Sequence, residues 1–276
     1  MVKNVTYIKN RLRQRFRQIS PINFFSPRKC DFLVIGVQKG GTTALDAYMR
    51  LHPGIELPYQ KEIDLFNSKY YSYVQPVVDN FHSIYFPKPD FSKKRGEVTP
   101  SYCHSPNGLE NIHRYNPDVK LVLLLRNPYL RAFSHWNMSV QNNTNKSTFK
   151  DAIVKEIQGL KEGKEKTYFN DYLYRSLYSI QVEEIYKYFA KESVLVLKSD
   201  QLLYEPNETL GMITDFIGVD KFDEIEPLTV HKREYNSGLT TECCEMMAEY
   251  IEPDLERLSG LVDWDFSEWH IQNHSA

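Results

Sequence analysis

The sequence predicts an α/β fold in which a parallel sheet is flanked by helices within a single domain. Short runs of apolar and β-branched residues alternate with segments of helical periodicity, which is the order expected of β–α units. Two of the runs, Lys120–Arg126 and Ser193–Lys198, are almost continuously apolar. Such strands are typical of a parallel sheet that is covered on both faces, with right-handed crossovers placing the helices on it.

The individual elements follow from these patterns in chain order. The predicted strands are Asp31–Gly36, Gly96–Thr99, Lys120–Arg126 and Ser193–Lys198. The predicted helices are Thr42–Leu51, Leu109–Tyr115, Tyr129–Val140, Phe149–Leu160, Tyr172–Ala190 and Thr241–Tyr250. The stretch Gln141–Lys166 is polar and rich in Asn and Lys, so we expect a mobile flap within it.

Residues 1–29 are predicted to form a basic amphipathic helix ahead of the main domain, residues 30–276. Apolar residues recur there at helical spacing, at Val5, Ile8, Leu12, Phe16 and Ile19. Residues 1–30 also carry eight Lys or Arg and no Asp or Glu. A helix of this kind either packs its apolar face on the domain or lies on an anionic membrane surface, and the sequence leaves both open for residues 3–20.

The composition argues against several classes of protein. With a formal net charge of −2 over 276 residues, the chain lacks the excess of Lys and Arg expected of a nucleic-acid binder. Its four cysteines have no metal-ligand spacing, so we expect free thiols in a reducing compartment. No apolar run reaches the roughly 18–20 residues of a spanning helix. We therefore expect a cytoplasmic protein whose one possible membrane contact is a peripheral one at the inner surface, through the N-terminal helix.

A glycine-rich turn lies between the first predicted strand and the first predicted helix. It reads Gly36-Val37-Gln38-Lys39-Gly40-Gly41-Thr42-Thr43. The paired glycines allow a tight turn that aims backbone N–H groups at an anion, and the helix N-terminus adds partial positive charge. Lys39 and the two threonine hydroxyls supply further donors. The pattern predicts a P-loop-like phosphate cradle, although it is not the Walker A pattern, in which Lys directly precedes Ser or Thr.

A second candidate anion site follows the third predicted strand. Arg126 ends that strand at the carboxyl edge, where open α/β sheets bind ligands. Pro128 suits the first turn of the next helix, and Ser134 lies about two turns along it. A guanidinium and a hydroxyl in this arrangement form a phosphate clamp. Two phosphate sites in one domain indicate a nucleotide that is phosphorylated at both ends.

With these motifs in this order, the sequence resembles the sulfotransferases that depend on 3′-phosphoadenosine-5′-phosphosulfate (PAPS). The resemblance rests on the segments KGGTT, KE followed by LF, GEVTPSY, LLLRNPYLRAFSHW and the C-terminal EPDLERL followed by DF. It runs from about residue 31 to residue 269. The sequence is more similar to the branch that contains the heparan sulfate sulfotransferase domains than to the cytosolic phenol and steroid enzymes.

The resemblance implies a role for each matching residue. The loop Lys39, Gly40, Gly41, Thr42 and Thr43 would hold the 5′-phosphosulfate of PAPS, with Lys39 at the bridging oxygen. Arg126 and Ser134 would hold the 3′-phosphate, and adenosine 3′,5′-bisphosphate would be the product. Glu62, directly after Lys61, would be the catalytic base, and we expect it to lie unpaired in a cleft. No metal is required, because a sulfate monoester carries less charge than a phosphate.

The resemblance says less about the acceptor. The stretch Glu97–Tyr102 matches the family segment that lines the acceptor side, so Lys61, Thr99 and Tyr102 are candidate contacts for a saccharide or glycolipid. Val98 stands where glycosaminoglycan enzymes tend to have a lysine, which argues against a polyanionic acceptor. Lys232 and Arg233 fall where the family has a basic loop over the nucleotide, but without its usual spacing.

Other functions remain open on the sequence. A kinase-like nucleotide phosphotransferase shares such cradles but lacks support here, since neither GK[ST] nor an Asp at a strand end for Mg²⁺ is evident. A sulfotransferase for a small non-carbohydrate alcohol is a second alternative, and a non-catalytic nucleotide- or membrane-binding protein is a third. We expect His104 and His135 to have structural roles, because neither position resembles a catalytic histidine.

Overall fold

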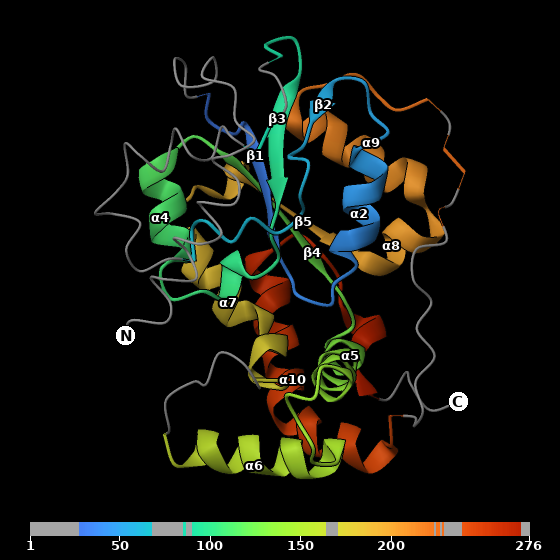
Figure 1. Cartoon of the computed structure of the whole chain (residues 1–276). Helices are drawn as coiled ribbons and strands as arrows, with labels where there is room; N and C mark the ends of the chain where they lie inside the picture. Colours follow the sequence, from blue (N-terminus) through green and yellow to red (C-terminus); the bar gives the residue numbers. More distant parts are fainter. Residues whose placement is uncertain are drawn as a thin grey trace.

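The computed structural model describes residues 28–67, 85–86, 90–163, 171–223, 225–226, 228 and 239–271. Within these residues a five-stranded sheet runs in the order β2-β3-β1-β4-β5, and every pair of neighbouring strands is parallel (Figure 1). The predicted N-terminal helix and the pair Lys232 and Arg233 lie outside the described residues.

The strands confirm the predicted α/β class. Their bounds are β1 Phe32–Gly36, β2 Ile55–Glu56, β3 Lys94–Val98, β4 Lys120–Leu125 and β5 Val194–Lys198. All four predicted strands are present within a residue or two of their expected ends. The two-residue β2 was not predicted, because a strand that short has no readable periodicity.

Helices cover both faces of the sheet. The α-helices are α2 Thr42–Met49, α4 Gly108–Tyr115, α5 Pro128–Gln141, α6 Phe149–Lys161, α7 Tyr178–Tyr186, α8 Ser199–Tyr204, α9 Pro206–Ile217 and α10 Thr241–Leu261. Four short 3₁₀ turns are η3 Tyr102–His104, η4 Tyr174–Ser176, η5 Lys191–Ser193 and η6 Ser267–Trp269. Helices α2, α8 and α9 lie on one side of the sheet and α4, α7 and α10 on the other, while α5 and α6 extend beyond the carboxyl ends of the strands (Figure 1).

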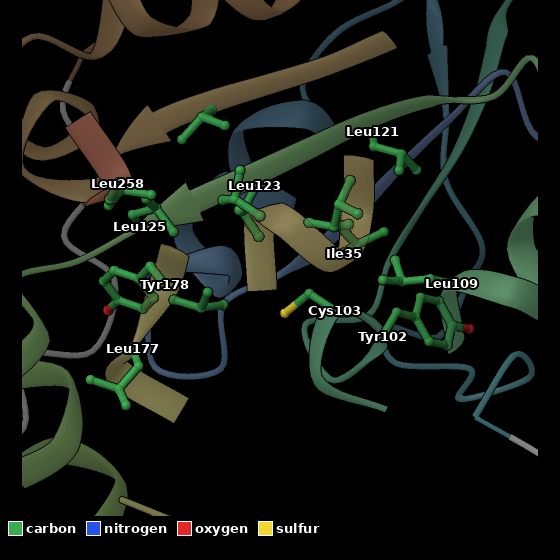
Figure 2. Packing of buried hydrophobic residues seen from close by; sticks show 14 of the residues in the cluster. Ile35, Tyr102, Cys103, Leu109, Leu121, Leu123, Leu125, Leu177, Tyr178 and Leu258 are labelled. Carbon is green, nitrogen blue, oxygen red and sulfur yellow. The ribbon is translucent and has the colours of Figure 1, made fainter. Parts of the chain in front are cut away.

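Side chains of each strand alternate between the two layers. In β4, Leu121, Leu123 and Leu125 join the larger cluster on the α7 and α10 side, whereas Val122 and Leu124 join the smaller cluster under α2 and α9. Figure 2 shows the three leucines of β4 on the same face as Ile35 of β1, with Tyr178 and Leu258 nearby. The continuous apolar pattern of β4 therefore has the cause predicted for it, which is burial on both faces.

Two helical predictions needed correction. The expected helix Tyr172–Ala190 is divided into η4 and α7, because the backbone of Leu177 between them is not helical, with a ψ of 89°. Helices α8 and α9 were not predicted. Helix α9 begins with Pro206 in its first turn and ends at Gly218, whose φ is 77°.

The C-terminal residues close the edge of the sheet around a buried lysine. Lys198, the last residue of β5, points its ammonium towards the rings of Trp264, Phe266 and Trp269, at 5.4, 5.2 and 5.8 Å from their centroids. The ammonium also donates to Glu268 Oε1 at 2.8 Å. Cation–π contacts of this kind are stronger when the cation is withdrawn from water. They tie η6 to β5.

Among the described helices, none combines the length and the apolar character needed to cross a membrane.

Candidate active site

The carboxyl ends of three neighbouring strands converge at one edge of the sheet. β1 pairs with β3 and β4 in parallel, so Gly36, Val98 and Leu125 end side by side. The loops that follow them carry most of the residues singled out from the sequence (Figure 1). Open α/β sheets bind ligands at this edge.

The first loop is built around close backbone contacts. A Cβ on Gly40 would lie 2.4 Å from the carbonyl oxygen of Leu124, so only glycine fits there. Gly41 caps α2 with a φ of 90°, and Lys39 adopts a φ of 71°. Since the first N–H groups of a helix have no partner within it, this turn presents donors as a phosphate cradle does.

Two arginines, Arg131 and the partly buried Arg175, contact Gln38 of this loop. Arg131 Nη1 lies 3.5 Å from the carbonyl oxygen of Gln38, and Arg175 Nη1 donates to Gln38 Oε1 at 2.6 Å. Arg131 also donates through Nε to Ser176 Oγ at 2.8 Å and through Nη2 to the carbonyl of Tyr172. Burial lowers the pKa of Arg131 to about 10, which still leaves it a cation at neutral pH, and burial lowers the pKa of Arg175 as well.

The second candidate anion site lies beside the first. Arg126 directly follows β4, and its Nη1 is 3.4 Å from the carbonyl oxygen of Lys39. Tyr178 donates its hydroxyl to the carbonyl of Arg126 at 2.7 Å, which fixes the backbone there. Asn127 caps α5 by accepting from two N–H groups of its first turn. Ser134 lies on α5 as expected and is 2 % exposed.

Lys39 and Arg126 are thus neighbours. The Lys39 ammonium lies 3.9 Å from Met138 Sδ on α5, so it is directed across the loop towards that helix. Thr42 is buried at the start of α2, whereas Thr43 is exposed. Two cationic side chains and a helix N-terminus therefore gather at the ends of β1 and β4.

Glu62 lies on a loop that is attached to the end of β3. Its N–H donates to the carbonyl of Val98 at 3.1 Å, and its φ is 59°. The side chain is 50 % exposed and forms an ion pair with Lys61, 2.5 Å from Nζ to Oε1. The expectation of an unpaired Glu62 is therefore wrong, because the adjacent ammonium folds back onto it. The same pair makes Lys61 the nearest cation to the candidate base.

Two of the three side chains expected to contact the acceptor lie inside the protein instead. Thr99 and Tyr102 are both 0 % exposed. Their hydroxyls donate to Glu97 Oε1 at 2.6 and 2.7 Å, and Glu97 is itself fully buried. An acceptor cannot reach either hydroxyl in this arrangement, because the carboxylate of the preceding strand draws both inwards.

Asp64 is a further residue of the Glu62 loop that the sequence did not single out. Its Oδ1 accepts hydrogen bonds from Ser101 and Asn67, both at 2.9 Å. Partial desolvation by the surrounding protein raises the pKa of Asp64, although the residue reaches solvent, and the nearby charges of Glu62 and Glu97 raise it further. No local motif marks it, since one of these contacts, Ser101, lies in a segment more than thirty residues away.

The two histidines are placed as structural residues. His135 is buried against the ring of Tyr172, and burial with the neighbouring arginines lowers its pKa to about 2. His104 Nε2 lies 3.6 Å from Asp171 Oδ2, and burial lowers its pKa too. Both rings are therefore neutral at physiological pH.

Sequence reasoning missed the two arginines that contact Gln38. Arg131 stands inside the second motif, five residues after Arg126, so its position was visible even though its role was not. Arg175 belongs to no local pattern and reaches Gln38 only through the packing of η4. Within the described part of the chain, no group of three or more His, Cys, Asp or Glu is arranged to hold a metal ion.

Comparison with known proteins places this geometry in a family. The family description "Sulfotransferase domain" matches residues 29–250. Membrane-associated sulfotransferase kil1 of Dictyostelium discoideum is 37 % identical over 111 residues, which are 40 % of this chain and 23 % of that protein. Human heparan sulfate glucosamine 3-O-sulfotransferase 6 is 27 % identical over 189 residues, or 68 % of this chain and 52 % of that protein. The chain thus spans about half the length of the human relative and a smaller share of the Dictyostelium protein.

A solved structure shares the fold over most of its length. The sulfotransferase from Alicyclobacillus acidocaldarius superposes with a TM-score of 0.70 at 24 % identity. The superposition covers 88 % of this chain and 99 % of that chain. The arrangement of the sheet and its flanking helices is therefore the same in both proteins.

Proposed function

Because the chain belongs to the sulfotransferase family, whose co-substrate is PAPS, we propose that it transfers a sulfuryl group from PAPS to a hydroxyl or amine of a saccharide or glycolipid. The observation that carries the proposal is the meeting of two anion sites at the ends of β1 and β4. Arg126 Nη1 lies 3.4 Å from the carbonyl oxygen of Lys39, so the two candidate sites are adjacent. A nucleotide with a phosphate at each end fits such a pair.

The donor half of the site would act through fixed positive charge. The cradle that excludes a Cβ at Gly40 brings the backbone close enough to bind the 5′-phosphosulfate, and Lys39 would stabilise charge on the bridging oxygen as the S–O bond breaks. Arg126 and Ser134 would bind the 3′-phosphate. Arg131 and Arg175 lie behind Gln38, where they keep the loop in place and add to the positive potential.

The acceptor half would supply the base. Glu62 would accept the proton of the incoming hydroxyl while that oxygen attacks sulfur in line with the leaving phosphate. In the structure Glu62 pairs with Lys61, and both side chains reach solvent. When the acceptor binds, Lys61 would move from the carboxylate to the acceptor, which leaves Glu62 free to take the proton.

An uncharged acceptor hydroxyl suits this half of the site. Glu62 and Asp64 are both exposed on the loop after β2, and the position of Val98 holds no cation for an anionic sugar. A saccharide or glycolipid hydroxyl would avoid repulsion by these carboxylates. A small non-carbohydrate alcohol would satisfy the same charges, so it is retained as the second candidate.

An acceptor screen tests the proposed activity. Purified protein and ³⁵S-labelled PAPS are incubated with neutral glycosides, glycolipid extracts, small alcohols and heparan-type oligosaccharides, and labelled products are separated by chromatography. The Glu62→Gln protein serves as the matched control for each acceptor. We expect label in a neutral glycoside or glycolipid that depends on Glu62. Transfer to the small alcohols alone would favour the second candidate, and no transfer to any class would contradict the activity.

Nucleotide binding separates the proposal from a kinase-like phosphotransferase. Thermal unfolding is measured with adenosine 3′,5′-bisphosphate and, in parallel, with ATP and Mg²⁺. A ligand that binds only the folded protein raises the unfolding temperature. We expect a clear rise with the bisphosphate and a smaller one with ATP and Mg²⁺; the reverse order would support the phosphotransferase.

The proposal extends to peripheral membrane contact through residues 3–20. Their apolar stripe and unbalanced arginines suit an anionic lipid surface. We expect the full chain to sediment with phosphatidylserine vesicles at low salt and to dissociate at high salt. The matched variant replaces four arginines with glutamine: Arg11, Arg13, Arg15 and Arg17. If both proteins stay in the supernatant at low salt, the helix packs on the domain and the chain remains cytoplasmic without a membrane contact.

A further inference from the structure

The loop that carries Glu62 has a backbone that must be held in place. Glu62 and Asp64 have φ values of 59° and 57°, in the left-handed region that side chains other than glycine rarely adopt. Two such residues within three positions each cost free energy, so the conformation persists only where neighbouring residues enforce it. The contacts that enforce it therefore determine where the base lies.

Those contacts come from the segment that follows β3. The N–H of Leu65 donates to the hydroxyl of Tyr102 at 3.1 Å, and Ser101 Oγ donates to Asp64 Oδ1 at 2.9 Å. Tyr102 then donates its own proton to Glu97 Oε1 at 2.7 Å. The hydroxyl of Tyr102 is thus an acceptor for the loop and a donor to the buried carboxylate at the same time.

Glu97 determines the direction in which the Tyr102 hydroxyl points its proton. A phenol can rotate its proton freely, and a carboxylate, which only accepts, fixes that proton on its own side. The lone pair of the Tyr102 oxygen then faces the N–H of Leu65. Thr99 donates to the same oxygen of Glu97 at 2.6 Å, which holds the carboxylate in turn. Burial and the charge of Glu97 raise the pKa of Tyr102 well above its usual range, so the phenol stays protonated.

We propose that Glu97 and Tyr102 are positioning residues, which act as a buried relay that fixes the Glu62 loop for catalysis. The inference rests on the proposed function, because it takes Glu62 as the base. It also accounts for a fully buried carboxylate that the donor site does not use. A buried charge is costly unless hydrogen bonds compensate it, and here two hydroxyls do so on one oxygen.

The chain offers a matched control for Tyr102. Tyr115 is also a buried tyrosine of the same hydrophobic cluster, and its hydroxyl accepts from the N–H of Cys30 at 2.6 Å. Cys30 precedes β1, so this hydroxyl contact lies at the amino end of the strands, while the Tyr115 ring, which Phe would keep, packs on Phe66 with 5.0 Å between ring centroids. Tyr102→Phe and Tyr115→Phe each remove one buried hydroxyl that accepts from a backbone N–H.

Hydrogen exchange tests the relay without any acceptor. Exchange of the amides in residues 61–67 is followed by mass spectrometry in the wild-type protein and in both Phe variants. We expect exchange in this segment to be about tenfold or more faster in Tyr102→Phe and unchanged in Tyr115→Phe. Equal rates in this segment for wild type and Tyr102→Phe would overturn the relay, whatever the activity of the protein proves to be.

A double-mutant cycle then tests whether the relay acts through Glu62. With the acceptor identified in the screen, we expect kcat of Tyr102→Phe to fall by about tenfold to a hundredfold while affinity for adenosine 3′,5′-bisphosphate is unchanged. In the Glu62→Gln background, Tyr102→Phe should cause no further loss, since a misplaced base that cannot accept a proton costs nothing more. If the kcat of the double variant is lowered by the product of the two single-variant losses, the relay is overturned.

The two proposals fail in different ways. If Glu62→Gln keeps wild-type turnover, the base assignment fails, and the exchange result still reports whether Tyr102 fixes the loop. If Glu62→Gln loses turnover while Tyr102→Phe keeps it, the relay fails and the base assignment stands. Should Tyr102→Phe not fold, Glu97→Gln replaces it in both experiments, because the amide keeps the shape but frees the Tyr102 proton to rotate.

Discussion

The donor and base halves of the site are held in place by different kinds of interaction. At the ends of β1 and β4, the loop around Lys39 is defined by backbone contacts and by two arginines, of which Arg131 is buried and Arg175 partly buried. At the end of β3, the Glu62 loop is held by a few hydrogen bonds to side chains, and its functional carboxylate is half exposed. The backbone of the donor loop is therefore fixed by packing, whereas the Glu62 side chain of the base half is free to change its rotamer.

This difference matches what each half must recognise. A phosphate cradle binds the same group in every turnover, so a loop fixed by the packing of Gly40 against β4 suits it. The base must meet an acceptor whose shape varies more, and on a fixed backbone the solvent-reaching side chains of Lys61 and Glu62 can still change their rotamers. The comparison predicts that substitutions in the donor half weaken binding, while those in the base half lower turnover.

The largest expected effect is on the base half. Glu62→Gln keeps the shape of the side chain but removes the proton acceptor, so kcat should fall by about 10²–10⁴-fold. Affinity for adenosine 3′,5′-bisphosphate, measured by calorimetry, should stay close to that of the wild type. Turnover that survives the substitution would mean that another group accepts the proton, and Asp64 on the same loop would be examined next.

The next effect is expected in the donor half. Lys39→Ala and Arg126→Ala should each weaken binding of adenosine 3′,5′-bisphosphate by about 1.5–3 kcal/mol, or roughly 10- to 150-fold, because a charge-assisted bond to phosphate is lost. Lys150→Ala is the matched control, since Lys150 is exposed and its ammonium pairs with Glu242. Unchanged affinity in both donor-site variants would remove the donor assignment.

A smaller effect sharpens the claim that backbone packing fixes the donor loop. Gly40→Ala places a Cβ 2.4 Å from the carbonyl oxygen of Leu124, so we expect about 1–3 kcal/mol of lost stability and weaker binding of the bisphosphate. Gly211→Ala in α9 is the control, because nothing lies within 4 Å of its Cβ, and it should stabilise by about 0.5–1 kcal/mol. Urea unfolding compares the two. Equal stabilities would contradict the close contact at Gly40.

The smallest effect concerns a carboxylate behind the donor half. Glu156 accepts from the N–H groups of Tyr172, Leu173 and Tyr174 at 2.9, 2.9 and 2.7 Å, which anchors the segment that carries Arg175. Burial raises its pKa from an ordinary 4.5 to about 7. Between these two values the folded protein keeps a proton that the unfolded chain releases, so this group makes the free energy of unfolding fall as pH rises.

Glu156→Gln removes that proton exchange. Relative to the variant, the wild type should lose about 1–3 kcal/mol of unfolding free energy between pH 5 and pH 7.5, as measured by urea unfolding at both values. The difference between the two proteins isolates Glu156 from the other groups that titrate. Parallel pH profiles would show that Glu156 is already ionised in the folded protein at pH 5.

The same contrast explains how far the sequence could be interpreted. Strands β1 and β4 were predictable because both of their faces are buried, which leaves a continuous apolar run. The loop after β1 was predictable because glycine is required where a backbone oxygen lies so close. The break of Tyr172–Ala190 into η4 and α7 was not, because the conformation of Leu177 between them depends on tertiary packing.

The base half was less accessible to prediction for a physical reason. Glu62 was found by its position in a motif. Its backbone φ of 59° and its pairing with Lys61 could not be predicted, because neither is indicated by the residue types of the segment. Thr99 and Tyr102 were expected to face the acceptor, and the buried carboxylate of Glu97 turns both inwards. Local sequence does not determine whether the hydroxyls of Thr99 and Tyr102 point to the acceptor or to the interior, because their partner Glu97 is placed by tertiary packing.

The lysine enclosed at the end of β5 has a consequence for synthesis of the protein. Trp269, one of the rings around Lys198, packs edge-on to Tyr178, and Tyr178 supports the carbonyl of Arg126. A ribosome completes Arg126 well before it adds Trp269. In a nascent chain, Arg126 therefore lacks the support of Trp269, which is synthesised more than a hundred residues later. Partly synthesised chains would present the donor loop without this support. We therefore expect nucleotide binding to begin only when η6 has left the ribosomal exit tunnel.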